Sequence, residues 1–309
     1  MRIVFWGTPE FATPPLLALI GEGFDVVGVV TQPDKPRGRS RSQLDPSPVK
    51  QVAMDEGIAV LQPERPRGDE FVQALRDLDP DLSVVVAYGH ILPREVIDLP
   101  RLGTLNIHAS LLPALRGAAP IQAAIAEGCE ETGVSIMRMV SALDAGPVIH
   151  ALATSIEPDE TGGELTLRLS ELGATALVEA LALMDAGALD ERPQDDARAT
   201  YAKKIERDDA RVDWSQPAVV VARRIRAYDP KPGAWSSVRG GEARVFGARA
   251  VTGRARAPGE VLQADEAGIV VACGDDAVII REVHPAGKKR MTVADWVKGR
   301  GVAVGDRWS

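Results

Sequence analysis

Residues 105–120, LNIHASLLPALRGAAP, carry an amide and an imidazole two positions apart in an apolar, strand-like run. Side chains alternate along an extended chain, so Asn106 and His108 lie on the same side of the strand. The run then breaks into a proline loop, which places both polar groups near the carboxyl end of the strand. Open α/β sheets bind their ligands at that edge.

An aspartate in the glycine-flanked turn LDAGP, Asp144, completes a candidate set for acyl-group transfer. An Asn amide can donate to a developing oxyanion, a His can accept a proton from an attacking amine, and an Asp can orient the imidazole. Ser110 precedes Leu-Leu-Pro rather than standing in a nucleophile elbow, which favours direct transfer over a covalent acyl-enzyme. Spacing alone leaves open whether His108 is catalytic or structural, and whether Asp144 reaches it.

Other cofactor and metal chemistry finds little support. The loop FWGTPEF has one glycine and lacks the G-x-G-x-x-G pattern, so a nicotinamide cofactor is disfavoured. This loop is either a tight strand-to-helix turn or a lining of the substrate site. The two cysteines and four histidines are scattered, so no metal site is expected and both thiols are interpreted as packing residues.

A basic, proline-broken loop occupies residues 31–50, TQPDKPRGRSRSQLDPSPVK. It follows a strand and should emerge at the same edge as the catalytic candidates. Such a loop suits a phosphate-rich partner, although a plain solvated loop remains the alternative. Its basic residues are Lys35, Arg37, Arg39, Arg41 and Lys50.

The elements that must position these groups alternate between strand-like and helix-like patterns up to about residue 190. Strands are predicted at 2–6, 24–31, 82–89 and 104–110, with a hairpin formed by 133–140 and 147–156. This alternation predicts an α/β fold with a mostly parallel, doubly wound sheet. A polar segment without apolar period follows and is interpreted as a linker. Beyond it, one helix and several short, glycine-punctuated strands predict a small closed β-barrel.

Charge is distributed unevenly along the 309 residues, whose net charge is −8. Residues 207–309 hold 18 basic and 13 acidic residues, a balance of +5, whereas the remainder balances at −13. This asymmetry suggests a polyanionic partner for the C-terminal part, or is a chance imbalance. There is no apolar run long enough for a membrane span and no signal-peptide pattern at the start, which predicts a cytoplasmic protein.

At these residues the sequence resembles the methionyl-tRNA formyltransferases, over nearly its whole length. The segments that carry the resemblance fall in the family's order: FWGTPEFA, VVTQPDKPRGR, PSPVK, VVAYGHILP, LNIHASLLPALRGAAPIQAAI, LDAGPV, YAKKIERDDARVDW, RAYDPKPGAW and PAGKKRM. The NIHASLLP block is shared by other enzymes that use 10-formyltetrahydrofolate. The C-terminal segments point to the tRNA enzyme.

The resemblance implies a Rossmann-like catalytic domain at 1–189, a linker at 190–206 and an OB-like β-barrel domain that contacts tRNA at 207–309. It implies transfer of a formyl group from 10-formyltetrahydrofolate to the α-amine of methionine on initiator methionyl-tRNA, for translation initiation. No metal and no membrane partner are expected, and the protein is expected to be a monomer.

The resemblance also assigns roles to positions of this sequence. Asn106, His108 and Asp144 map to the catalytic trio. The basic loop departs from the common form, with one extra residue and the run RGRSRSQLD, and Arg39 is the best match to its key arginine. Folate-binding positions are Tyr88, Gly89, Ser110, Leu111, Leu112 and Pro113. tRNA-binding positions are Lys35, Arg37, Arg39 and Arg41 in the loop, and Lys288, Lys289 and Arg290 near the C-terminus.

Three alternatives stay open at this level. A formyltransferase acting on a sugar amine or a purine-precursor amine would not need the C-terminal domain. A non-catalytic RNA-binding protein would not need Asn106, His108 and Asp144. A nicotinamide oxidoreductase lacks its glycine fingerprint. His90 is interpreted as a loop residue, His150 as packing or surface, and His284 as lying near the tRNA face.

Overall fold

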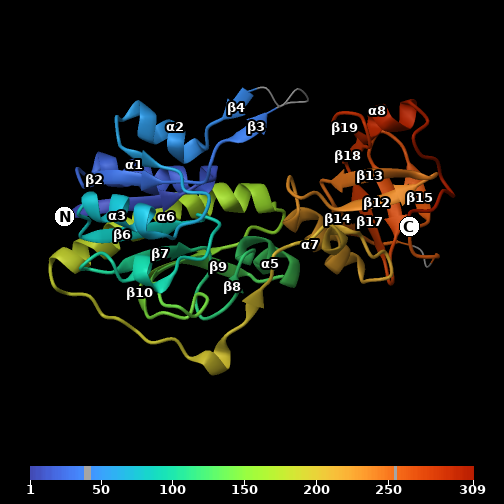
Figure 1. Ribbon diagram of the computed structural model, residues 1–309. Helices are drawn as coiled ribbons and strands as arrows, with labels where there is room; N and C mark the ends of the chain where they lie inside the picture. Colours follow the sequence, from blue (N-terminus) through green and yellow to red (C-terminus); the bar gives the residue numbers. More distant parts are fainter. Residues whose placement is uncertain (38–42, 254–255) are drawn as a thin grey trace. The chain divides into compact units, whose positions relative to one another are not determined.

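The computed structural model describes residues 1–37, 43–253 and 256–309. These residues form two compact units, and each is described by itself (Figure 1). The first contains 1–117, 133–154 and 166–201, and the second contains 118–132, 155–165 and 202–309. Both units are therefore built from more than one stretch of chain.

The first unit is organised around a seven-stranded sheet in the order β10-β9-β7-β6-β1-β2-β5. The pairs from β7 to β5 are parallel, whereas β9 runs antiparallel to β7. This arrangement confirms the mostly parallel α/β sheet that the sequence predicts. The strands are β1 (Arg2–Gly7), β2 (Asp25–Val30), β5 (Val60–Leu61), β6 (Leu82–Val86), β7 (Thr104–His108), β9 (Glu131–Arg138) and β10 (Val148–Ser155).

Helices connect these strands, and α2 begins at a side-chain cap. The Ser47 hydroxyl accepts the backbone N–H of Lys50, and Pro48 opens the helix behind it. The helices of the chain's first two thirds are α1 (Thr13–Gly21), preceded by the 3₁₀ turn η1 (Glu10–Ala12), then α2 (Pro48–Asp55), α3 (Asp69–Asp77), α4 (Arg94–Ile97), α5 (Pro120–Glu127) and α6 (Gly162–Asp185).

Packing on the sheet determines which way the residues of β7 point. Gly173 of α6 lies so close to Ile107 that an added Cβ would stand 3.1 Å from the Ile107 side chain. Ile107 therefore faces α6. Because successive side chains of a strand alternate, Asn106 and His108 face the opposite side of the sheet.

Two small pairings complete the first unit. The basic loop forms a hairpin of β3 (Lys35–Arg37) and β4 (Gln43–Asp45), with Lys35 opposite Asp45. The segment expected to be a linker contains the 3₁₀ turn η2 (Asp196–Arg198) and the short strand β11 (Tyr201–Ala202). This strand pairs with β8 (Arg116–Gly117), which follows the loop after β7.

The second unit contains two four-stranded antiparallel sheets, of order β12-β13-β18-β19 and β14-β17-β16-β15. These strands form the small OB-like β-domain predicted after the linker. Its elements are η3 (Asp208–Ala210), α7 (Ala218–Ala227), β12 (Trp235–Val238), β13 (Gly241–Phe246), β14 (Arg249–Val251), β15 (Val261–Ala264), β16 (Ile269–Ala272), β17 (Ala277–Ile280), β18 (Glu282–Pro285), β19 (Met291–Thr292) and α8 (Val293–Lys298).

Two further findings concern the described residues as a group. None of their helices combines the length and apolarity needed to cross a membrane. Cys273 is buried, which raises the pKa of its thiol to about 12, and burial also raises the pKa of Cys129. Both thiols are therefore poor nucleophiles near neutral pH.

Candidate active site at the carboxyl end of β7

Asn106 is the middle residue of β7 and pairs with Val85 of β6 on one side and Met137 of β9 on the other. It is half-buried, and within the described part of the chain its side chain has no hydrogen-bond partner. An amide held on a rigid central strand with its donor atoms uncommitted can be used by a ligand. Asn106 therefore offers the kind of donor that oxyanion stabilisation requires.

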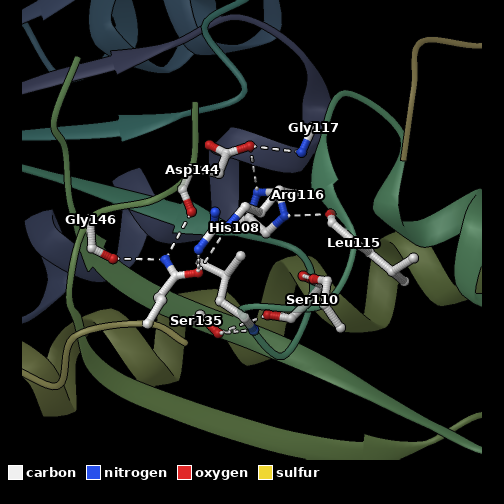
Figure 2. Close-up of polar contacts among 11 residues, drawn as sticks. His108, Ser110, Leu115, Arg116, Gly117, Ser135, Asp144 and Gly146 are labelled. Carbon is white, nitrogen blue, oxygen red and sulfur yellow. Dashed lines mark hydrogen bonds and ion pairs between the residues drawn. The ribbon is translucent and has the colours of Figure 1, made fainter. Parts of the chain in front are cut away.

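His108 is held in one orientation and one tautomer. Its side chain is 6 % exposed, and Nε2 lies 2.9 Å from the carbonyl oxygen of Leu115 (Figure 2). A carbonyl can only accept, so Nε2 carries a hydrogen and donates it. In the neutral ring the lone pair is therefore on Nδ1, which is the nitrogen that can accept a proton.

The carboxylate of Asp144 faces that nitrogen. Asp144 Oδ2 lies 3.7 Å from His108 Nδ1 and accepts the backbone N–H of Gly117 at 2.8 Å. The first distance is too long for a hydrogen bond, so the interaction is one of charge. Asp144 and His108, 36 positions apart in the sequence, are thus brought together.

The turn that carries Asp144 depends on local backbone geometry. Asp144 has φ of +48°, and a Cβ at Gly146 would overlap the carbonyl of Arg138. The glycine of the LDAGP run is therefore required for the chain to pass this close to β9. This close approach fixes the turn and hence the carboxylate.

The proposed folate segment is tied to the sheet by hydroxyl groups. Ser110 is buried, and its hydroxyl donates to the Ala114 carbonyl at 2.6 Å. The Ser135 hydroxyl donates to the Ser110 carbonyl and accepts the N–H of Leu112. The Ser110 side chain is thus used inside the loop. The half-buried residues Leu111, Leu112 and Pro113 are the part of the segment that a ligand can contact.

Tyr88, which is predicted to bind folate, has its side chain in the core. Tyr88 is 2 % exposed and belongs to the core formed with Trp6, whose ring it meets edge-on at 5.3 Å. Burial raises the pKa of its phenol to about 12. Only the exposed backbone around Gly89, with φ of +89°, is available at this edge of the sheet.

Sequence reasoning missed a buried arginine and a glutamine that flank the trio. Arg116 is 3 % exposed, and its guanidinium donates to Gln194 Oε1 at 3.0 and 2.9 Å and to Asp196 at 2.8 Å. Burial lowers the pKa of Arg116, but its hydrogen bonds to Asp196 and Tyr201 outweigh this effect and raise the pKa. The RGAAP run next to the catalytic candidates could have pointed to Arg116. Gln194 lies in a polar segment without a hydrophobic pattern, so the sequence gives no indication of its contacts.

The same formyl-transfer architecture is found in known proteins. The family model "Formyl transferase" matches residues 1–181, and "Formyl transferase, C-terminal domain" matches residues 204–301. The methionyl-tRNA formyltransferase of Pseudomonas fluorescens SBW25 is 48% identical over 97% of this chain and 94% of its own length. That of Magnetococcus marinus is 47% identical over 99% and 97%. The chain belongs to the methionyl-tRNA formyltransferase family.

Solved structures share the fold of this family member at low sequence identity. HypX from Aquifex aeolicus in complex with tetrahydrofolic acid superimposes with a TM-score of 0.69 and 23% identity. The match covers 98% of this chain but only 48% of the HypX chain, so it spans about half of that protein. Methionyl-tRNA formyltransferase from Clostridium thermocellum gives a TM-score of 0.59 at 13% identity, covering 91% of this chain and 98% of its own.

The basic hairpin of this methionyl-tRNA formyltransferase family member is anchored at its base. Asp34 accepts from Lys50 Nζ at 2.5 Å and from Gln62 Nε2 at 2.7 Å. These hydrogen bonds hold the pKa of the Asp34 carboxyl below its ordinary value. Lys35 and Arg37 stand in β3, whereas Arg39 and Arg41 lie outside the described residues.

The three basic residues predicted to meet tRNA near the C-terminus differ in environment. Lys288 and Lys289 are exposed and have no ion pair among the described residues. Arg290 binds Asp229 at 2.7 and 3.1 Å, pairs with Glu282 and stacks 4.0 Å from the Phe246 ring centre. The guanidinium of Arg290 is therefore engaged inside its own unit, which is a structural use the sequence did not predict.

The remaining histidines have different surroundings. His90 is an exposed loop residue beside Tyr88, His150 pairs with Glu179 at 2.6 Å, and His284 lies in β18 opposite Arg244. Across residues 1–37, 43–253 and 256–309, no group of three His, Cys, Asp or Glu is arranged to hold a metal ion.

Proposed function

We propose that this chain transfers the formyl group of 10-formyltetrahydrofolate to the α-amine of methionine on initiator methionyl-tRNA. The product is N-formylmethionyl-tRNA, which is used in translation initiation. The observation that carries the mechanism is the pair of uncommitted groups at the end of β7. These are the amide of Asn106, whose side chain has no hydrogen-bond partner among the described residues, and the Nδ1 of His108, which faces the Asp144 carboxylate.

Asn106 stabilises the charge that develops during attack. The neutral amine of the methionyl ester adds to the formyl carbon, a new C–N bond forms, and negative charge builds on the formyl oxygen. The Asn106 amide donates to that oxygen. The folate lies against the backbone of residues 111–113 and the loop around Gly89, which fits an extended ligand at the carboxyl edge of the sheet.

His108 moves the proton that the reaction must relocate. Its Nε2 hydrogen is committed to the Leu115 carbonyl, so Nδ1 is the nitrogen that accepts and later releases the proton. The amine loses a proton to Nδ1 directly or through one water, and Asp144 stabilises the resulting imidazolium. The proton then passes to N10 of the folate as its bond to the formyl carbon breaks. No covalent enzyme intermediate is needed.

The parts of the chain take separate roles in this proposal. Residues 1–189 carry catalysis and residues 207–309 bind tRNA, joined by residues 190–206. The basic hairpin with Lys35, Arg37, Arg39 and Arg41, and the pair Lys288 and Lys289, contact tRNA phosphates. The protein acts as a monomer in the cytoplasm, where charged initiator tRNA enters translation.

A single-turnover assay with 10-formyltetrahydrofolate tests the proposal. The acceptors are methionyl initiator tRNA, methionyl elongator tRNA and free methionine. Formylation confined to the initiator tRNA is the expected result. Equal formylation of free methionine, or activity only on an amino sugar or a purine-precursor amine, would overturn the assignment of the acceptor.

A further inference from the structure

The segment between α6 and β11 runs along the loop that follows the catalytic strand. It begins with a backbone pairing of Arg192 with Val148 in β10 and ends with β11 beside β8. Two of its side chains, those of Gln194 and Thr200, reach the backbone that holds His108 and Asp144. Figure 2 shows His108, Asp144, Leu115 and Gly146 in this arrangement. This segment is therefore part of the construction of the site.

Thr200 holds both peptide planes of Leu115. Its hydroxyl accepts the N–H of Leu115 at 2.8 Å, and its carbonyl accepts the N–H of Arg116 at 2.9 Å. The second of these planes also carries the Leu115 carbonyl, which receives the His108 Nε2 hydrogen. Leu115 has φ of +58°, a conformation that needs support from its surroundings. Thr200 provides that support from 85 positions away.

Gln194 holds the turn that carries Asp144. Its Nε2 donates to the carbonyls of Asp144 at 2.8 Å and Gly146 at 2.7 Å. Its Oε1 accepts from the Arg116 guanidinium. Two carbonyls can only accept and a guanidinium can only donate, so one amide orientation satisfies all of them. A glutamate of the same shape could not donate to the two carbonyls.

We propose that Gln194 and Thr200 are positioning residues for the formyl transfer, acting through Asp144 and Leu115. They set the separation between the carboxylate and Nδ1 and keep His108 in the tautomer with hydrogen on Nε2. The proposal rests on the proposed function for its reaction. Its structural part, the tautomer of a free-enzyme histidine, does not depend on any substrate.

Isosteric variants separate positioning from simple stability. Thr200→Val removes the acceptor while keeping the shape, Thr200→Ser restores it, and Gln194→Glu removes the two donors. Thr175→Val is the control. Thr175 is exposed, and within the described part of the chain its hydroxyl donates only to the Glu171 carbonyl of its own helix. Each variant is examined for kcat, for KM of both substrates and for the midpoint of thermal unfolding.

Thr200→Val and Gln194→Glu are expected to lower kcat by about 10- to 10²-fold with KM values within about threefold, because a small misplacement of reacting groups costs rate rather than binding. Thr200→Ser should recover most of kcat. ¹⁵N NMR of the four histidines, with His108 assigned by difference from His108→Gln, should show hydrogen on Nε2 in the native protein. The spectrum of the Thr200→Val variant should show a mixture of the two tautomers of His108.

The two hypotheses fail in different ways. A folded Thr200→Val protein with native kcat and a native His108 ring spectrum would overturn the positioning role. The positioning role would also be overturned if kcat fell only in step with the unfolding midpoint and Thr200→Ser did not restore it. If the native protein formylates none of the methionyl acceptors, the proposed function fails, while the ring spectra still decide whether Thr200 holds the histidine.

Discussion

At the scale of single residues, the members of the trio differ in the hydrogen bonds and charge contacts that each side chain makes in the free protein. His108 donates one ring hydrogen to a backbone carbonyl and faces a carboxylate with its other nitrogen. Asp144 already accepts a backbone N–H. Asn106 alone has no partner among the described residues, so its removal from the free protein breaks no internal hydrogen bond. This difference allows catalysis and stability to be separated experimentally.

Asn106→Ala is expected to lower the single-turnover rate by roughly 10²–10³-fold, the loss typical of removing one oxyanion donor. The unfolding midpoint should stay close to that of the native protein. The rate is measured with saturating 10-formyltetrahydrofolate and methionyl initiator tRNA, beside a thermal scan. A folded variant with a near-native rate would remove Asn106 from the role of oxyanion donor.

At the scale of elements, apolar patterns predicted the parallel strands because those strands are buried on both faces. They did not predict where β6 ends. The sequence suggests a strand to residue 89, but β6 stops at Val86, since Ala87 and Gly89 adopt positive φ. Asn106 and His108 could be paired from their spacing of two. Their link to Asp144 depends on a turn whose position only the folded chain defines.

The contribution of the segment around Thr200 could not be predicted for a related reason. Its contacts are hydrogen bonds from polar side chains to backbone groups far away in the sequence, and such contacts leave no apolar period. The interior position of the Tyr88 ring and the ion pair of Arg290 with Asp229 are likewise tertiary. A polar segment without periodicity is therefore a weak basis for inferring a free linker.

The anchor of the basic hairpin gives a prediction at the same scale. The pKa of Asp34 is lowered by its hydrogen bonds from Lys50 and Gln62. The ionised carboxyl therefore stabilises the fold above the ordinary value of 3.8, and this contribution is lost as the pH falls through the lowered pKa. Asp34→Asn should reduce the unfolding midpoint equally at pH 7 and pH 5, and progressively less below about pH 4.

The control for that prediction is Asp55→Asn, because Asp55 is exposed on α2 and, among the described residues, accepts only from Gln51. Its substitution should change the midpoint little at any of these pH values. An Asp34→Asn effect that persists undiminished at pH 3, in protein that is still folded, would contradict the assigned charge dependence.

At the scale of the whole molecule, charge is divided between the parts that the proposal assigns to folate chemistry and to tRNA. Residues 207–309 carry a balance of +5 and the rest of the chain −13. Not every basic residue of the C-terminal part is available to a polyanion, because Arg290 is already paired with Asp229 and Glu282. Lys288 and Lys289 are the exposed charges next to it.

The double variant Lys288→Ala/Lys289→Ala should raise KM for methionyl initiator tRNA and leave kcat and stability close to native. Each lost phosphate contact reduces the slope of log KM against log salt by slightly less than one, so a total reduction of about 1–2 is expected. KM measured between 50 and about 300 mM salt gives this slope. An unchanged slope would show that these two lysines do not contact phosphates.

Arg290→Ala serves as the matched comparison. It leaves the Asp229 carboxylate, whose side chain is 8 % exposed, without its partner. A stability loss of about 1–3 kcal/mol is expected for such an orphaned group. The salt slope for tRNA should change less than in the lysine variant.

The distance along the chain between Leu115 and Thr200 also bears on the order in which the protein is made. A ribosome adds about 5–20 residues per second, so the 85 positions between them take about 4–17 s to synthesise. During that interval the sheet can assemble, but the Leu115 carbonyl lacks the partner that fixes its peptide plane. We expect nascent chains stalled before residue 190 to protect their central strands from proteolysis and yet to transfer no formyl group. Catalytic competence would then arrive as one late event in biosynthesis, after the N-terminal fold is complete.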